Sequence, residues 1–237
     1  MDTKAVTNTR PDGSTQNRRR GPKVAAGVRV PRAGRPETPL ITRHAAAGAA
    51  LRLIDENGLD ALSLQSVAKA LGVSAPSLYH HFQDKEELLT QVTRCLLEEI
   101  NHEQDVWSED WETRTIELSL ATRRVALRHP NAAPLALRFF PRKVMLPAYE
   151  HSLQDCPYPP AAHAILTEAI EKFTYGSALF AAAAKAHHMP AMPEVDAAHF
   201  PHLANALANA PQDDETLHLE ALAVVLAGLK ARYGQVG

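Results

Sequence analysis

A short run of polar side chains between Ser74 and Gln83 carries the clearest chemistry in this chain, because no acidic residue lies between its two ends. Its hydroxyl and imidazole groups are able to hydrogen-bond to base edges and phosphate oxygens. Lys85 follows at the start of the next expected helix, beside free backbone N–H groups that would form a small anion-binding corner with it. The polar side chains of the run are Ser77, Tyr79, His80 and His81.

The surrounding sequence, residues 62–89, predicts two short helices joined by a tight turn. Ser63 is a typical N-terminal cap of the first helix, and Gly72 ends it, because glycine adopts the left-handed conformation without strain. Ser74 caps the second helix, with Pro76 in its first turn, where a missing N–H costs little. The first helix has one apolar face, formed by Leu64, Val67, Ala68 and Leu71. This pattern is typical of a helix-turn-helix.

A third helix is expected directly after Phe82, with Asp84 and Glu87 as a capping-box-like pair at its start. The alternative to a DNA-binding unit is a capped helical hairpin inside an all-α domain. Leu78 and Phe82 belong to the core on either interpretation. The acid-free polar face favours DNA binding, because a recognition helix reads base edges while flanking groups contact the backbone.

The segment Ile41–Leu89 resembles the N-terminal domain of the TetR family of bacterial regulators, over about a fifth of the chain. The sequence ALRLIDENG at 50–58 matches the end of that domain's first helix. The helix-turn-helix and the start of helix 4 are matched by LGVSAPSL at 71–78 together with Tyr79, Phe82, Lys85, Leu88 and Leu89. The resemblance implies an all-α dimer, with a C-terminal domain that binds a small effector and alters DNA affinity.

The DNA contacts of the family carry over by position to Thr42, Gln65, Ser77, Tyr79, His81 and Lys85. Ala75 and His80 fall where the family varies most, and we expect them to help set operator choice. Ala75 offers only a methyl contact, for instance to thymine. Pro76 completes the set of predicted DNA-binding residues.

The composition is that of a soluble globular protein, with 237 residues, 45% of them hydrophobic and 22% charged. No apolar stretch reaches the roughly 18 residues of a membrane span, and no secretory signal is recognisable at the N-terminus. Only two cysteines occur, Cys95 and Cys156, and they have no zinc-type spacing. A cytoplasmic location without membrane contact is therefore expected.

Charge is distributed unevenly along the chain. Residues 1–37 hold nine Lys/Arg and three Asp/Glu, a net charge of +6, so the other residues carry −8 of the total of −2. Such a segment buries too little apolar surface to fold alone. It is either a solvated tail, or the product of a wrongly assigned start codon, or an arm that follows the phosphate backbone of DNA or enters a minor groove.

We expect three regions: the basic arm at 1–37, the helix-turn-helix domain at 38–88, and a helical effector-binding and dimerisation domain at 89–237. The first helix starts at Thr38–Pro39 or at Thr42 and ends at Asn57–Gly58. A loop is expected at 187–201. The later helices are expected from Lys85 to about His102, from Trp111 to His129, from Asn131 to Leu137, over Leu146–Gln154 with Pro147 in its first turn, from Ala161 to about Ala186, and over Asp214–Tyr233.

The last two long helices would form a four-helix dimer interface with a second subunit, as the resemblance implies, although the sequence alone also allows a monomeric bundle. An effector pocket is expected in the second domain, suited to a hydrophobic or aromatic molecule. The candidate lining residues, each of which is also a plausible core residue, are His102, Trp107, Phe139, Phe140, Tyr149 and Phe173.

Other chemistry finds little support in the sequence. Four histidines share one segment (His187, His188, His199 and His202) but lack compact zinc spacing, so no metal and no cofactor is assigned. No catalytic motif such as a nucleophile elbow, P-loop or HExxH occurs.

The favoured hypothesis is a ligand-responsive transcriptional repressor that binds a palindromic operator as a homodimer. An effector-independent DNA-binding or architectural protein is the main alternative, and an α-helical enzyme is the third. The sequence does not name the operator or the effector.

Overall fold

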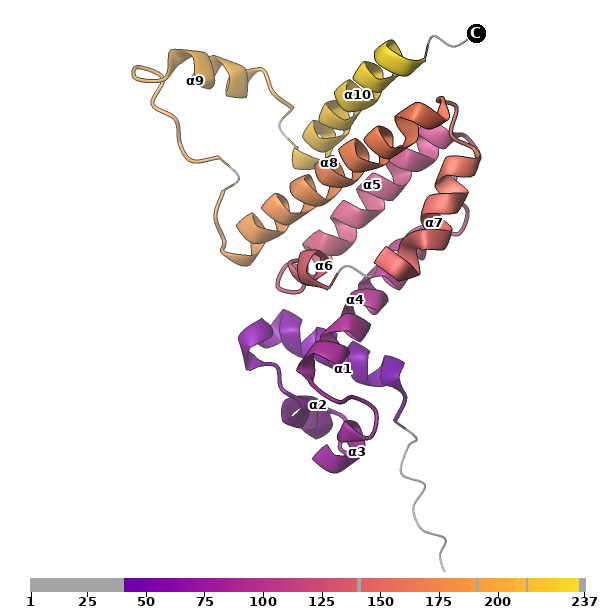
Figure 1. The fold of residues 1–237 in the computed structure, drawn as a ribbon. Coiled ribbons are helices and arrows are strands. Elements are labelled where there is room, and N and C mark those ends of the chain that lie inside the picture. Colours follow the sequence, from indigo (N-terminus) through magenta and orange to yellow (C-terminus); the bar gives the residue numbers. More distant parts are fainter. Residues whose placement is uncertain (1–40, 140–141, 191, 212, 235–237) are drawn as a thin grey trace, which may run out of the picture. The chain divides into compact units, whose positions relative to one another are not determined.

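The computed structural model of this protein describes residues 41–139, 142–190, 192–211 and 213–234, and every regular element in these ranges is a helix (Figure 1). The expected all-α fold class is confirmed. Residues 1–37, Thr38–Pro39 and Phe140 lie outside the described residues. The helices are α1 Arg43–Asn57, the 3₁₀ turn η1 Leu59–Ala61, α2 Leu64–Ala70, α3 Ala75–Tyr79, α4 Lys85–Asn101, α5 Trp111–Arg128, α6 Leu135–Arg138, α7 Arg142–Gln154, α8 Pro160–Ala186, α9 Pro201–Ala208 and α10 Asp214–Tyr233.

The first helix begins at the second of its two predicted starts. Thr42 caps α1, and its Oγ1 accepts the N–H of Ala45 at 3.0 Å. Gly58 ends the helix with φ of +78°, as the sequence predicted. The buried face of α1 is rich in alanine, so that neighbouring helices approach its backbone closely: Ala46, Ala47, Ala49, Ala50, Leu51 and Ile54.

The turn between α2 and α3 follows the predicted pattern. Ser63 and Ser66 form a reciprocal capping box at the start of α2, and Gly72 takes φ of +67° after it. Ser74 caps α3, with its Oγ 3.4 Å from the N–H of Ser77. The next cap differs from the prediction. Asp84 accepts the N–H of Glu87, whereas the Glu87 carboxylate accepts the N–H of Gln83, one residue before the cap.

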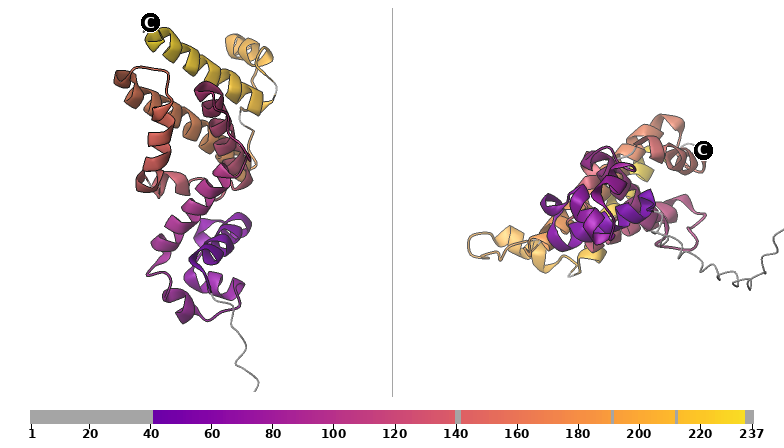
Figure 2. Two further views of the ribbon diagram at one scale, coloured as in Figure 1. Left: turned by 90° about the vertical axis from the view of Figure 1, so that its right-hand side faces the viewer. Right: turned by 90° about the horizontal axis from the view of Figure 1, so that it is seen from below.

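Helix α4 links the N-terminal helices to the rest of the described fold (Figure 2). Its apolar stripe is buried: Leu88, Leu89, Val92, Leu96 and Ile100. These residues join one hydrophobic core that also includes residues of α1–α3, Val125 of α5 and Leu135 of α6. The core is therefore continuous along α4. The expected domain boundary between residues 88 and 89 falls within this helix and stays a prediction.

A second core lies among the C-terminal helices, where α5 and α8 run side by side and α10 packs on them (Figures 1 and 2). Its buried apolar residues are Trp111, Tyr158, Ala162, Leu166, Leu222, Leu226 and Leu229. Polar side chains are also buried here, among them Ser119, Thr174 and His218. No described helix is both long and apolar enough to cross a membrane.

Several predicted boundaries in this region are wrong. Helix α7 begins at Arg142, four residues before the expected start, so Pro147 lies inside it. Helix α6 begins at Leu135 after Pro134, and Asn131 donates its side-chain N–H to the Asp55 carbonyl instead of capping a helix. Helix α9 was not predicted, although Leu203, Ala206 and Leu207 recur at helical spacing.

Candidate nucleic-acid interface and effector pocket

The second helix of the helix-turn-helix turns its polar side chains to solvent. Tyr79 is 52% exposed, and Pro76 and His80 are exposed as well. Leu78 and Phe82, on the opposite side, are fully buried in the core. This inward anchor fixes the direction of the outward side chains. Of the other predicted contacts, Thr42 and Gln65 are exposed, whereas Ala75, Ser77, His81 and Lys85 are half-buried.

Of the predicted DNA contacts, Thr42 also caps a helix and Ser77 hydrogen-bonds to a cap, Ser74. Thr42 Oγ1 accepts a backbone N–H of α1, and Ser77 Oγ lies 2.7 Å from Ser74 Oγ. A capping hydroxyl accepts a hydrogen bond and keeps its own hydrogen, which it is able to donate to a phosphate oxygen. Capping and phosphate binding are therefore compatible at Thr42.

Lys85 has a structural contact that the sequence did not indicate. Its Nζ donates to the Leu59 carbonyl oxygen at 3.2 Å, which ties the first turn of α4 to η1. An ammonium group has three hydrogens, so a phosphate contact would be additional to this bond. The expected anion-binding role of Lys85 stays a prediction.

Arg43 contacts the segment that joins α3 to α4, and the sequence analysis did not identify it. Its guanidinium donates to the His81 carbonyl, pairs with the Glu87 carboxylate at 2.6 Å, and lies 4.5 Å from the centre of the Phe82 ring. The Gln83 backbone N–H and then the Arg43 guanidinium hold the pKa of Glu87 below its usual value. The only feature of the sequence that could have pointed to this role is that a basic residue, Arg43, directly follows the Thr42 cap.

A cavity of about 170 Å³, partly open to solvent, lies among α5, α7 and α8. Its wall is mostly apolar and aromatic, with hydroxyl groups and one carboxylate. Besides Leu118, Met145 and Ile170, the wall includes Trp111, Ser119, Tyr149, Glu171, Thr174 and Tyr175. A more open depression of about 640 Å³ shares Glu171 and Tyr175 with it.

The predicted effector residues are not brought together at this cavity. Tyr149 lines it, but Trp107 and Phe139 pack against the first core and His102 is exposed at the end of α4. Phe173 belongs to the second core, where it stacks on His218. The residues that do share the cavity recur at helical spacing within α5, α7 and α8, but nothing in the sequence shows that these three faces meet.

Glu171 is the polar centre of the cavity wall. Its side chain is 18% exposed, accepts a hydrogen bond from the Tyr149 hydroxyl, and lies 3.9 Å from an Arg142 nitrogen. Burial, and then the bond to Glu171, raises the pKa of Tyr149, so the phenol is neutral and donates. These contacts hold α7 against α8, and the Trp111 indole N–H holds α7 against α5 through the Ser152 carbonyl at 2.9 Å.

A buried hydrogen-bond network continues from the cavity wall to α10. Ser119 Oγ lies 2.8 Å from Thr174 Oγ1 and 3.1 Å from His218 Nε2, and Ser177 Oγ lies 2.8 Å from His218 Nδ1. Burial lowers the pKa of His218, which stays neutral at pH 7. Because Ser119 and Thr174 also line the cavity, a ligand there contacts the same network as α10.

A second histidine, His129, connects the end of α5 to α1 and α4. His129, directly after α5, bonds to Asp55 of α1 at 2.7 Å and to Glu99 of α4 at 2.9 Å. The bond to Asp55 is the main cause of a raised pKa of His129. Arg128 adds an ion pair with Glu99 at 2.6 Å. These contacts connect the helix-turn-helix to the cavity-bearing helices.

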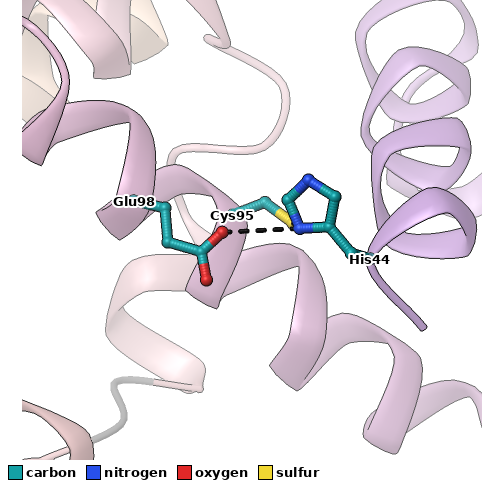
Figure 3. Close-up of side chains that lie close together, drawn as sticks. All are labelled: His44, Cys95 and Glu98. Atoms are coloured by element: carbon teal, nitrogen blue, oxygen red, sulfur yellow. Dashed lines mark hydrogen bonds and ion pairs between the residues drawn. The ribbon is translucent and has the colours of Figure 1, made fainter. Parts of the chain in front are cut away.

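Among the described residues, one group brings together the side-chain chemistry of metal ligands. It consists of His44 on α1 and of Cys95 and Glu98 on α4 (Figure 3). The sequence gave no indication of it, because His44 and Cys95 are far apart along the chain.

Two family models match the chain. The model of bacterial regulatory proteins of the tetR family matches residues 48–92, and that of the tetracyclin repressor-like C-terminal domain matches residues 107–233. The tetracycline repressor protein class A from transposon 1721 of Escherichia coli is 36% identical over 87 residues, which are 36% of this chain and 40% of that protein. The match thus spans less than half of that relative's length.

Solved structures resemble a longer part of the chain. A possible TetR family transcriptional regulator from Streptomyces coelicolor A3(2) is 28% identical, with a TM-score of 0.61, over 80% of this chain and 99% of that one. The Streptomyces coelicolor TetR family protein ActR in complex with (S)-DNPA is 25% identical, with a TM-score of 0.62, over 81% and 98% of the two chains. The C-terminal family model alone covers more than half of the chain, and this protein therefore belongs to the tetR family of bacterial regulatory proteins.

Proposed function

We propose that this protein is a DNA-binding transcriptional repressor that a small-molecule effector releases from its operator. The observation that carries the proposal is the short α3, which is anchored by buried Leu78 and presents Tyr79 and His80 to solvent. A recognition helix needs this combination of a fixed base and exposed hydrogen-bonding groups. Membership of the tetR family supports it.

The direct test is selection of bound sequences from random duplex DNA by the purified protein. We expect a palindromic motif, because two recognition helices of a symmetric dimer read two half-sites about 34–36 Å apart. The double variant Tyr79→Ala, His80→Ala should lose the motif while keeping the helical circular dichroism spectrum. Selection of the same sequences by this variant would contradict the proposed interface.

The proposed dimer rests on an exposed apolar surface. Phe180 on α8 is 83% exposed, and on α10 Val224 is 72% exposed and Leu217 is 43% exposed. Large apolar groups at these exposures are typical of interaction sites, and α8 and α10 are the two helices expected to pair. Phe180→Asp with Val224→Asp should convert the dimer to monomer in sedimentation at micromolar concentration. A wild-type protein that sediments only as monomer would contradict the proposal.

The effector site that we propose is the cavity among α5, α7 and α8. At about 170 Å³ it is smaller than the ~300–1,000 Å³ of typical ligand pockets. A ligand of ordinary size therefore has to displace α7, whose contacts to its neighbours run through Tyr149, Glu171 and Trp111. That displacement also reaches Ser119 and Thr174, and through them His218 on α10.

The chemistry of the wall favours an apolar or aromatic effector that carries one amine or other hydrogen-bond donor. Aromatic rings and methyl groups provide most of the contact surface, and Glu171 provides the carboxylate that such a donor needs. ActR, a relative, has been solved with the small molecule (S)-DNPA.

The test is a thermal-shift screen with pairs of aromatic compounds that differ only in an amine. We expect the amine of a pair to stabilise the protein and to release it from the selected DNA. Glu171→Gln should remove the preference for the amine, whereas Thr167→Ser, a mild change at the same wall, should retain it. Stabilisation without DNA release would separate ligand binding from the proposed regulation.

A further inference from the structure

Three side chains from two helices converge beside the junction of α1 and α4. His44 lies in the first turn of α1, while Cys95 and Glu98 are three residues apart on one face of α4 (Figure 3). Cys95 Sγ is 3.8 Å from His44 Nδ1, and Glu98 Oε2 is 3.5 Å from the same nitrogen. All three candidate ligand atoms lie within 4.8 Å of one another.

These separations match those of a tetrahedral zinc site. With bond lengths of ~2.3 Å to sulfur and ~2.0–2.1 Å to nitrogen and oxygen, tetrahedral angles place the ligand atoms about 3.3–3.6 Å apart. The Glu98 Oε2–His44 Nδ1 distance of 3.5 Å lies within this range, and the Cys95 Sγ–His44 Nδ1 distance of 3.8 Å exceeds it by about 0.2 Å, which a small side-chain rotation corrects. The third pair, Cys95 Sγ and the Glu98 carboxylate, lies within 4.8 Å, and rotation of the exposed Glu98 side chain brings it to bonding geometry without movement of a helix.

The ligand types also select among metals. A thiolate is a soft ligand, and an imidazole is borderline, so the set favours zinc-like ions over Mg²⁺ or Ca²⁺, which prefer oxygen ligands only. The exposed side-chain fractions of His44 and Glu98 are 72% and 51%, whereas Cys95 is half-buried. Solvent therefore has access to the site, and a water molecule would complete the tetrahedron.

We propose that His44, Cys95 and Glu98 bind one zinc-class divalent ion that joins the first turn of α1 to α4. On binding, the Cys95 thiol transfers its proton to solvent and coordinates as thiolate. The neighbouring Arg43 connects this turn of α1 to His81 and Glu87 beside the recognition helix. The ion thus fixes the position of the helix-turn-helix on α4. The site needs neither DNA binding nor the effector cavity to exist.

Co²⁺ is the probe of choice, because a thiolate ligand gives it a strong charge-transfer absorption in the near ultraviolet. Titration of the full-length protein with Co²⁺ should give this band, saturating at one ion per chain, and Zn²⁺ should abolish it by displacement. Cys156→Ser provides a matched control, since Cys95 and Cys156 are the only cysteines. Cys156→Ser should keep the band, and Cys95→Ser should lose it.

His44→Ala and Glu98→Gln test the other two ligands at exposed positions, where loss of folding is not expected. Each should weaken Co²⁺ binding by more than about tenfold, because even the loss of a hydrogen-bond partner of a metal ligand has an effect of that size. Saturating Zn²⁺ should raise the unfolding midpoint of the wild type by ~5 °C and leave His44→Ala unchanged. Absence of the charge-transfer band in the wild type, or its persistence in folded Cys95→Ser, would overturn the proposal, as would Co²⁺ binding that depends on His187 and His188 alone.

Discussion

The two cores of this protein differ in what they bury. In α1–α4 the buried residues are apolar except Thr93, whose hydroxyl donates to the Leu89 carbonyl of its own helix. Among the C-terminal helices the buried set includes six polar or charged side chains: Arg114, Thr115, Ser119, Arg123, Thr174 and His218. An apolar core packs in one way and holds a recognition helix in a fixed direction. A polar core carries hydrogen bonds that a ligand is able to exchange, which suits a domain that has to change its shape.

The largest expected effect is in the apolar core. Phe82 is buried beneath α3 and lies under the Arg43 guanidinium. Phe82→Ala leaves a cavity that the surrounding helices fill only partly, at a cost of about 3–5 kcal/mol in the free energy of unfolding. Urea denaturation followed by circular dichroism measures this loss. Phe82→Leu, which keeps most of the volume, should cost clearly less, and equal losses in the two variants would contradict tight packing here.

The polar core is expected to respond differently, because a charge there depends on its partner. Arg123 is 2% exposed and pairs with the Asp214 carboxylate at the start of α10. Asp214→Asn leaves a buried guanidinium without its counter-charge and should lower the free energy of unfolding by about 2–3 kcal/mol. Arg123→Met removes the charge as well and should cost less than Asp214→Asn. Urea denaturation of both variants tests this order, and the reverse order would show that the ion pair itself stabilises the domain.

The same difference explains how much the sequence revealed. The caps Thr42, Ser63 and Ser74 and the turn glycines Gly58 and Gly72 act within a few residues, so their roles are visible in the sequence and agree with the structure. The cavity and the His218 network join residues of three helices that are far apart along the chain. The structure also buries Ser119 and Arg123 of α5, which no local pattern marks. Their partners Thr174, His218 and Asp214 lie on helices far along the chain.

Two histidines make the stability of the protein depend on pH in opposite directions, because the pKa of His129 is raised and that of His218 is lowered. The raised pKa of His129 means that its contribution to stability is present below the unfolded-state value of about 6.5 and is lost as pH rises through the higher folded-state value. The lowered pKa of His218 means that the wild type loses stability as pH falls below about 6.5. Unfolding of His129→Gln and His218→Gln across pH 5–8, relative to wild type, should show the two opposite trends. Parallel trends in the two variants would contradict these assignments.

The smallest expected change in stability belongs to Tyr79, the most solvent-directed large side chain of α3. Substitution of an exposed residue away from caps and core alters the free energy of unfolding by no more than about 0.5 kcal/mol. Tyr79→Ala should nevertheless lower affinity for the selected DNA by roughly tenfold, because a phosphate or base-edge contact is lost. Fluorescence anisotropy with a labelled duplex measures this change.

Lys85→Ala is compared with Tyr79→Ala, because Lys85 has a structural contact as well as a predicted phosphate contact. Lys85 bonds to the Leu59 carbonyl, so its removal weakens the joint between α4 and η1 as well as any phosphate contact. A lost phosphate contact reduces the slope of log affinity against log salt by about one, whereas a purely structural role leaves the slope unchanged. We expect Lys85→Ala to change both slope and stability, and Tyr79→Ala to change affinity alone. Wild-type affinity in both variants would show that α3 does not lie on DNA, even though its polar face is exposed.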